Sequence, residues 1–396
     1  MQISSFTPLI PSSEKAHLLK EKAFDLTKKT SALLPHQHLL KTFKPLVQLM
    51  NCYYSNLIEG HHTLPFELEN ALNHQLSHDA AKRDLQQEAL AHIRVQNLID
   101  HDAAPAPGMS VDFLQWCHHQ FYQQLPDSMR MVEHAQTGES FEILPGKFRE
   151  RGVKVGNHIA PDATAIKPML ASMFSIYNRY SGTDALIAIA AANHRVAWVH
   201  PFMDGNGRTV RLMAHAAFKD LGMNIGLWSP SRGLARSVNQ YKQLLSRADQ
   251  VRQGASTDGR GALSEQGLID FCDYYLDTCI DQVEFMQGLF DVGNLLKRIE
   301  RYCHDEHECS NLTRDAFPLL REAIYRGQFE RGEVSQIIYG KSAVTGRRAL
   351  KALLDRGLLE SDTPRGAVRL AIPTHVLGAW FPNLYPKTAL LHEANP

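Results

Sequence analysis

The sequence predicts a mainly α-helical protein, with a small β-hairpin in its helical core and a winged-helix domain near its C-terminus. Apolar residues recur at spacings of three and four along most of the chain before residue 302, as they do on one face of an α-helix. Strand-like alternation is confined to a short stretch within residues 146–161. After residue 310 the pattern changes to three helices followed by two short strands, which is typical of a winged helix.

The 396 residues are predicted to form four segments. Residues 1–105 are an N-terminal helical region, 106–302 the helical core, 310–375 the winged-helix domain and 376–396 a C-terminal tail. The 42 basic and 42 acidic residues cancel, so no global charge favours nucleic acid or an anionic membrane as the main partner.

The first residues and the cysteines predict a cytoplasmic protein. The start, MQISSFTPLIPSSEKAH, has no basic segment followed by an apolar one, and no apolar stretch approaches membrane-spanning length. Six scattered cysteines fit a reducing compartment. Cys303, His304, His307 and Cys309 lie close enough to suggest zinc, but four ligands from seven residues need a sharp reversal, and the run has neither Gly nor Pro. A charged helix end or loop is favoured.

The first well-marked helix is predicted at residues 45–59, with Pro45 in its first turn and Gly60 as its C-terminal cap. Glu59 then lies at the negative end of the helix dipole, where a carboxylate is disfavoured by roughly 0.3–1 kcal/mol unless a cation meets it. A carboxylate at a position that the helix dipole disfavours suggests a functional role for Glu59.

Further helices are predicted at residues 68–99, 111–125, 183–200, 237–249 and 263–302. The helix that ends at His200 is apolar nearly all round, so it should be buried and should support His200 rigidly. His118 and His119 are adjacent and point in different directions, which favours core or surface roles over a metal pair.

The most informative stretch is residues 200–211, HPFMDGNGRTVR. Gly205 and Gly207 allow the backbone to turn several N–H groups toward one point, which makes a nest for phosphate oxygens. The helix predicted directly after them places this nest at a helix N-terminus, which attracts anions.

The side chains of this run suit phosphoryl or nucleotidyl transfer. Asp204 at the rim can hold Mg²⁺, which prefers carboxylates together with phosphate oxygens. Arg208 and Arg211 lie on one helix face and can bind further phosphates. His200 is the one group in the run that accepts a proton near neutral pH, so it is the candidate general base.

The run resembles the signature of the Fic-domain family, His-Pro-Phe-x-Asp/Glu-Gly-Asn-Gly-Arg-x-x-Arg, at every specified position. The resemblance implies a mostly helical fold that binds ATP with Mg²⁺ and transfers AMP to a hydroxyl of a protein. It also implies that His200 is the base, that Asp204 is the metal ligand, that Gly205, Asn206 and Gly207 hold the phosphates, and that Arg211 reaches the terminal one.

Residues 55–60, SNLIEG, resemble the inhibitory motif Ser/Thr-x-x-x-Glu-Gly/Asn that accompanies many Fic proteins. The resemblance implies an inhibitory helix at about 45–60, formed with Ser55, Glu59 and Gly60. In that family the glutamate pairs with the second arginine of the signature, here Arg211, and blocks the productive pose of the γ-phosphate. The alternative is a solvated charge at a helix end.

Two further parts of the chain resemble family elements. The segment 146–161 resembles the flap hairpin that aligns the target protein by adding it as a strand, here with Val153, Lys154, Val155, Gly156, Asn157 and His158. Residues 237–249 resemble the helix near the nucleotide base, with Tyr241 beside the adenine. Asp249 stands where better-studied members carry Asn, which leaves the identity of the base open. A connecting hairpin and a core tyrosine are the alternatives.

The winged-helix domain permits two kinds of partner. Within residues 341–369, seven basic residues exceed three acidic ones, a net of 7 − 3 = +4. This excess permits DNA contact, for example through Ser342, Thr345 and Arg348. Because the excess is modest, docking of a protein or dimer formation is slightly favoured, and a homodimer is implied by the family resemblance.

The sequence as a whole predicts a protein adenylyltransferase restrained by Glu59, with ATP and a target protein as partners. One alternative is a hydrolase that removes AMP, with Glu59 orienting the water. Another is a DNA-binding regulator whose core senses nucleotide.

Overall fold

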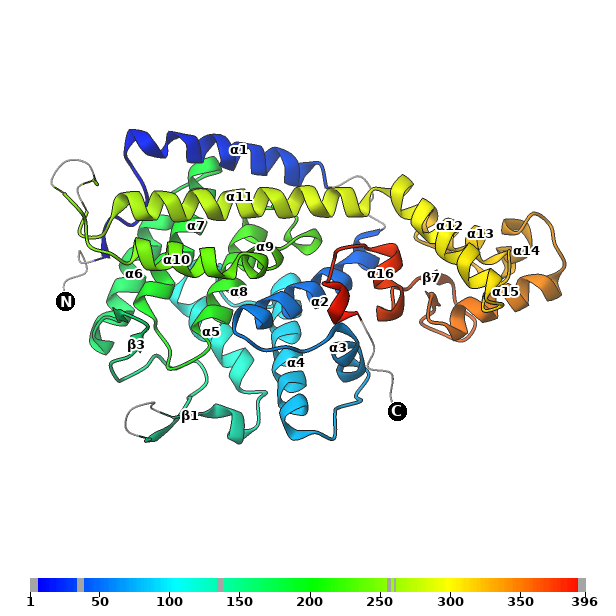
Figure 1. Ribbon diagram of the computed structural model, residues 1–396, viewed down its shortest axis with the longest axis horizontal. Helices are drawn as coiled ribbons and strands as arrows, with labels where there is room; N and C mark the ends of the chain where they lie inside the picture. Colours follow the sequence, from blue (N-terminus) through cyan, green and yellow to red (C-terminus); the bar gives the residue numbers. More distant parts are fainter. Residues whose placement is uncertain (1–5, 34–38, 134–137, 255–257, 260, 391–396) are drawn as a thin grey trace. The chain divides into compact units, whose positions relative to one another are not determined.

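The computed structural model describes residues 6–33, 39–133, 138–254, 258–259 and 261–390, and the protein is mainly helical, as predicted (Figure 1). The α-helices are α1 (His17–Ser31), α2 (Leu40–Ile58), α3 (Pro65–Leu72), α4 (Ala80–Asp100), α5 (Val111–Tyr122), α6 (Ile166–Tyr177), α7 (Gly182–Val199), α8 (Asn206–Asp220), α9 (Ser231–Arg236), α10 (Val238–Ala248), α11 (Glu265–Phe290), α12 (Val292–Glu308), α13 (Ala316–Arg326), α14 (Val334–Ile337), α15 (Ala343–Asp355) and α16 (Leu377–Trp380). The strands are β1 (Met131–Glu133), β2 (Ser140–Glu142), β3 (Lys154–Val155), β4 (His158–Ile159), β5 (Gln328–Phe329), β6 (Leu359–Glu360) and β7 (Val368–Leu370).

The chain divides into two compact units. The first comprises residues 1–33, 51–63 and 76–284, and the second comprises residues 34–50, 64–75 and 285–396. This division is coarser than the predicted four segments, which stay a prediction. Among the described residues, no helix combines the length and the apolar character that crossing a membrane requires.

Helix α7 is the centre of the first unit. It packs against α1, α6 and α8, and α8 in turn packs against α4 and α5. Residues 185–196 of α7 are all buried, as the apolar pattern predicts. The polar side chains among them are hydrogen-bonded: Arg195, for example, donates from Nε to the carbonyl oxygen of Pro8 at 3.0 Å. The end of α7 is therefore held by packing on several sides.

Three predicted helices have different bounds in the structure. Helix α2 begins at Leu40, so Pro45 lies inside it rather than in its first turn, and one backbone hydrogen bond is forgone. The helix predicted at 68–99 is split into α3 and α4, because the Asp79 carboxylate accepts from the backbone N–H of Lys82 at 2.9 Å and starts a new helix. Asp291 interrupts the predicted 263–302 helix in the same way, by accepting from Asn294 at 2.8 Å.

The second unit contains the C-terminal elements. Helices α13, α14 and α15 pack together, and strands β5, β7 and β6 form an antiparallel sheet in that order beside them. The predicted succession of three helices and two strands is present, with β5 as an additional strand after α13. The identity of this domain as a winged helix, and its choice between DNA and protein, stay predictions.

Candidate active site

The loop between α7 and α8 carries the run 200–211 and is shaped by its own side chains. Gly205 adopts a left-handed backbone with φ of 73° and begins α8 as its N-cap. Asn206 clamps the loop, because its Oδ1 accepts from the backbone N–H of Phe202 and its Nδ2 donates to the carbonyl of Phe202, both at 2.9 Å. The loop therefore fixes the start of α8, and the first N–H groups of a helix can bind an anion.

His200 ends α7 in a strained conformation. Its φ of 49° lies in the left-handed region, which few residues other than glycine adopt, and its N–H donates to the carbonyl of Val196 at 3.0 Å. Burial lowers the pKa of His200 to about 4. The imidazole is therefore neutral at neutral pH, as a general base must be.

Arg149 holds the turn at His200 through hydrogen bonds to its backbone. Its Nε donates to the carbonyl oxygen of His200 at 2.7 Å, and its Nη2 donates to that of Val199 at 3.3 Å. Its backbone N–H donates to the carbonyl of Pro201 at 2.9 Å. The sequence does not mark Arg149 for this role, because it lies within the strand-like stretch 146–161 and His200 is 51 positions away.

Asp204 is exposed at the rim of the loop. The Tyr122 hydroxyl donates to its Oδ2 at 2.9 Å. The ring of His118 lies with Nε2 3.3 Å from the Asp204 carbonyl oxygen, and its Nδ1 accepts from Gly146 at 2.9 Å. His118 is fully buried and stacks on Phe202 with 3.9 Å between ring centroids, so it is a core residue that supports the loop.

The two glycines of this turn lie close to side chains of other segments. A Cβ at Gly205 would lie 2.7 Å from a ring carbon of Tyr122. A Cβ at Gly207 would collide with the Glu59 carboxylate and would lie 3.1 Å from Nη1 of Arg211. The Glu59 carboxylate thus lies directly on the first turn of α8, where the nest would hold a phosphate.

The predicted motif 55–60 and the run 200–211 meet in the structure. Arg211 Nη2 lies 2.5 Å from Glu59 Oε1, and Arg211 also donates from Nε to the Ser55 hydroxyl at 2.9 Å and from Nη2 to the Ser55 carbonyl at 3.1 Å. The Arg211 side chain is 4% exposed and that of Glu59 is 33% exposed. Gly60 follows with φ of 87°, as expected of a C-terminal cap.

The Arg211 pair decides the charge state of Glu59. Burial by itself would raise the pKa of this carboxyl, but the charges of Arg211 and Arg208 outweigh it together with the hydrogen bond from Arg211. The pKa of Glu59 is therefore lowered, and the carboxylate is ionised at neutral pH.

Ser55→Ala should loosen Arg211 without removing Glu59. The substitution leaves the buried Nε–H of Arg211 without its acceptor, which should lower the free energy of unfolding by about 1–3 kcal/mol. Urea unfolding of wild type and Ser55→Ala measures the difference. Ser55→Thr keeps the hydroxyl and is the matched control, so its free energy of unfolding should lie closer to that of wild type. Equal stability of all three proteins would show that the hydrogen bond between Ser55 and Arg211 does not stabilise the fold.

Arg208 has partners on other segments that its place in the sequence does not indicate. Its Nη2 forms a buried ion pair with the Glu88 carboxylate of α4 and lies 3.0 Å from Nδ1 of His61. His61 in turn lies 2.5 Å from Glu88, and this hydrogen bond raises the pKa of His61. The guanidinium also lies over the ring of Phe121 at 5.5 Å. The Glu88 carboxylate thus balances the charge of Arg208. The predicted contact of Arg208 with a nucleotide stays a prediction.

Tyr241 on α10 is 6% exposed, with its hydroxyl 3.4 Å from Oδ1 of Asn193. Burial raises its pKa to about 12, and the charges of Arg211 and Glu59 also act on it. Asp249 lies 2.9 Å from Nε2 of His194. A contact between Tyr241 and a base stays a prediction.

The predicted hairpin is present at β3 and β4, which pair in antiparallel register with Val155 opposite His158. Gly156, with φ of 60°, and Asn157 form its turn. The side chain of His158 ties the hairpin to α7, because its Nε2 lies 2.7 Å from the carbonyl oxygen of Trp198. Ile159 is 71% exposed and Val155 is 45% exposed, so apolar side chains face solvent here. Target binding by residues 153–158 stays a prediction.

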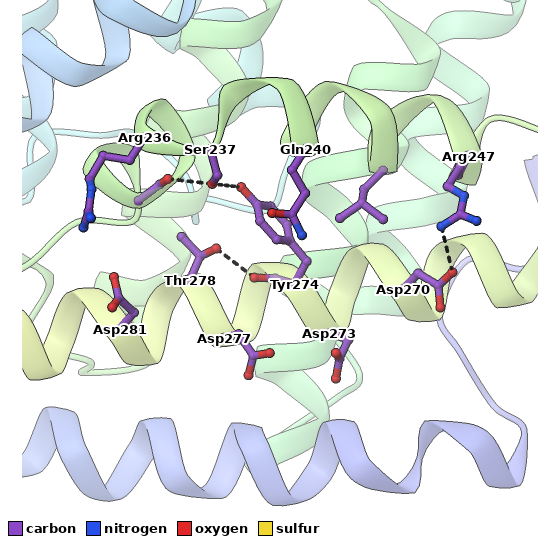
Figure 2. A pocket seen from close by; sticks show the side chains of 12 residues that line it. Arg236, Ser237, Gln240, Arg247, Asp270, Asp273, Tyr274, Asp277, Thr278 and Asp281 are labelled. Atoms are coloured by element: carbon purple, nitrogen blue, oxygen red, sulfur yellow. Dashed lines mark hydrogen bonds and ion pairs between the residues drawn. The ribbon is translucent and has the colours of Figure 1, made fainter.

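A pocket of about 770 Å³ lies elsewhere, between α9–α10 and α11 (Figure 2). Its wall carries Asp270, Asp273, Asp277 and Asp281, but Lys22 pairs with Asp273 and Asp277 at 2.6 and 2.7 Å. None of the residues 200–211 lines it. The chemistry-bearing side chains are at the α7–α8 loop, which is therefore the candidate active site.

One region of the chain matches a known protein family. Residues 109–218 match the model of the Fic/DOC family. A protein adenylyltransferase Fic of Drosophila erecta is 31% identical over 86 residues, which are 20% of this chain and 17% of that protein. One of Nematostella vectensis is 27% identical over 99 residues, which are 24% of this chain and 23% of that protein. The chain thus matches less than a quarter of the length of these relatives.

A solved structure has a similar fold along nearly the whole chain. The crystal structure of a Fic family protein from Desulfovibrio desulfuricans G20 covers 92% of this chain and 98% of its own, with a TM-score of 0.53. The two sequences are 16% identical, so this likeness concerns the fold alone.

Proposed function

Since residues 109–218 form a domain of the Fic/DOC family, we propose that this protein is an adenylyltransferase that is inhibited by its own Glu59. It transfers AMP from ATP to a Ser, Thr or Tyr hydroxyl of a target protein. The adenylyltransferase names of the two curated relatives support this activity. The observation that carries the proposal is the Glu59 carboxylate, which binds Arg211 and lies on the first turn of α8.

The reaction is a substitution at phosphorus. Neutral His200 takes the proton of the acceptor hydroxyl, and the oxygen attacks the α-phosphorus of ATP. The bond from the α-phosphorus to the bridging oxygen breaks, and pyrophosphate leaves. The N–H groups at Gly205–Gly207 donate to phosphate oxygens, so they hold the polyphosphate in line for attack.

The residues at the loop fit a magnesium ion. Asp204 is exposed, and the Tyr122 hydroxyl donates to its Oδ2, so its Oδ1 is not used by that bond. A Mg²⁺ bound there with phosphate oxygens would neutralise part of the charge on the polyphosphate. Tyr122 fixes the orientation of the carboxylate that would hold it.

Tyr122→Phe should raise the Mg²⁺ concentration needed for activity. The substitution keeps the ring beside Gly205 but removes the hydroxyl that orients Asp204, and loss of such a supporting contact typically weakens metal binding about 10–100-fold. Titration of AMP transfer with Mg²⁺ in the Glu59→Gly background measures the shift. An unchanged half-saturating concentration would show that the hydroxyl does not orient the ligand.

Inhibition follows from competition for one position. The ionised Glu59 already pairs with Arg211 and lies against Gly207. A terminal phosphate would therefore find Arg211 already paired and would be repelled by the Glu59 carboxylate. ATP can then bind only with its phosphates displaced from the in-line pose.

AMP incorporation distinguishes this function from its alternatives. Wild type, Glu59→Gly and Glu59→Gly with His200→Ala are incubated with cell lysate and ATP labelled at the α- or γ-phosphate. The proposal expects α-label on protein from Glu59→Gly, little from wild type and none above background from the double variant. Transfer of γ-label would indicate a kinase, and silence with both labels would leave adenylyl transfer without support.

A further inference from the structure

We infer that Arg149 is a positioning residue, whose guanidinium locks the flap hairpin β3–β4 to the backbone turn that presents His200. The inference rests on the proposed function only in taking His200 as the general base. It assigns a role to a buried cation that the proposed reaction does not otherwise use.

The guanidinium spans two parts of the chain. On one side it bonds to the carbonyls of Val199 and His200 at the end of α7. On the other side, Nη1 donates to the carbonyl of Arg151 before β3 at 2.7 Å, and Nη2 donates to that of Pro161 after β4 at 2.6 Å. The Arg149 side chain thus binds both ends of the hairpin and also the backbone at Val199 and His200.

Arginine is the residue that this arrangement requires. Arg149 is 3% exposed, and its guanidinium donates to four neutral carbonyl oxygens, those of Arg151, Pro161, Val199 and His200. A planar fork with five N–H donors can reach all of them, whereas a lysine ammonium is a single point charge with three donors. We therefore expect lysine to preserve the charge but lose the lock.

The lock supports a backbone conformation that His200 does not favour by itself. With φ of 49°, His200 needs surrounding contacts to keep its left-handed turn. Arg149 binds the carbonyl oxygen of that residue and the one before it, and the His158–Trp198 contact adds a second link from the hairpin. A target strand that pairs with the hairpin would consequently lie at a fixed position relative to the imidazole.

Charge gives the lock a second measurable effect. The groups that act on the His200 ring besides burial are the Ala197 backbone, Arg149, His158 and Asp204. Burial and the charge of Arg149 both lower the pKa of His200, while Asp204 raises it. Removal of the Arg149 charge should therefore raise the pKa of His200 toward its ordinary value.

The test compares Arg149→Gln, Arg149→Lys and the control Arg151→Gln, each in the full-length Glu59→Gly protein. Arg151 is a matched arginine two residues away, with a side chain that is 63% exposed, and only its backbone carbonyl takes part in the lock. We expect kcat for AMP transfer to fall about 100-fold in both Arg149 variants, with a smaller change in KM for ATP. Arg151→Gln should stay near the parent.

A second measurement does not depend on activity. Histidines are labelled with ¹⁵N, the His200 signal is identified by its loss in His200→Ala, and its pKa is titrated in each variant. The inference expects a raised pKa in Arg149→Gln and a shifted ring signal in Arg149→Lys, with neither change in Arg151→Gln.

Three outcomes separate the possibilities. Unchanged kcat in both Arg149 variants would overturn the inference. So would an equal loss of kcat, ATP affinity and melting temperature with an unaltered His200 signal, because that pattern describes a structural residue alone. If the Glu59→Gly parent transfers no AMP, the proposed function fails, and the His200 titration still decides the role of Arg149.

Discussion

Glu59→Gly is expected to raise AMP transfer at least about tenfold over wild type. The substitution frees Arg211, whose charge-assisted contact with a terminal phosphate is worth on the order of 1.5–3 kcal/mol, and about 1.4 kcal/mol corresponds to a factor of ten in rate. It also removes the carboxylate that lies against Gly207 in the phosphate nest. Initial rates of AMP incorporation at saturating Mg²⁺ measure the increase.

Glu59→Gln is the matched control for this prediction. The amide keeps the size of the side chain and can still accept from Arg211, but it carries no charge to repel a phosphate. Its rate should lie between those of wild type and Glu59→Gly. If Glu59→Gly instead abolishes an activity that removes AMP from modified protein, Glu59 acts in hydrolysis, and the inhibitory role proposed for it is wrong.

His200→Ala should abolish most of the activity that Glu59→Gly releases. A positioned general base typically contributes about 10²–10⁴-fold, so the double variant should lose a factor in that range. The His200 side chain makes few of the contacts that fix the loop, which Asn206 and Arg149 hold through the backbone. ATP binding and melting temperature should consequently change little, and their collapse would show that the loss reflects misfolding instead.

The pH dependence gives a further test of this base. The imidazole works only without its extra proton, and burial lowers its pKa to about 4. kcat/KM for AMP transfer by Glu59→Gly should therefore stay level as the pH falls from 8 to about 5 and decline only near pH 4. A decline that already begins at about pH 6.5, the ordinary pKa of histidine, would contradict the buried, neutral base.

The parts of the site that can be predicted from the sequence are those whose geometry is local. The turn at Gly205 and the start of α8 are consequences of adjacent residues, so both could be predicted from the run 200–211 alone. The pairing of Glu59 with Arg211 joins residues 152 positions apart, and it was predicted only because the motif 55–60 resembled a family element.

Contacts between distant segments carried no such signal. Tyr122 meets Asp204 across 82 positions and Arg149 meets His200 across 51, and neither spacing marks a pair in the sequence. Arg208 looked available for phosphate because Glu88 belongs to another helix. Two helix boundaries are not visible in the apolar pattern, because the pattern continues past Asp79 and Asp291. At each of these residues a single side-chain cap begins a new helix.

The central claim is that Glu59 and the terminal phosphates of ATP compete for Arg211 and the α8 N-terminus. Calorimetric binding of ATP and of AMP to wild type, Glu59→Gly, Arg211→Ala and the double variant tests it most directly. We predict that Glu59→Gly strengthens ATP binding about tenfold, that AMP binding is nearly unchanged, and that the gain disappears when Arg211 is also removed. An equal gain for AMP, or a gain that persists without Arg211, would contradict the claim.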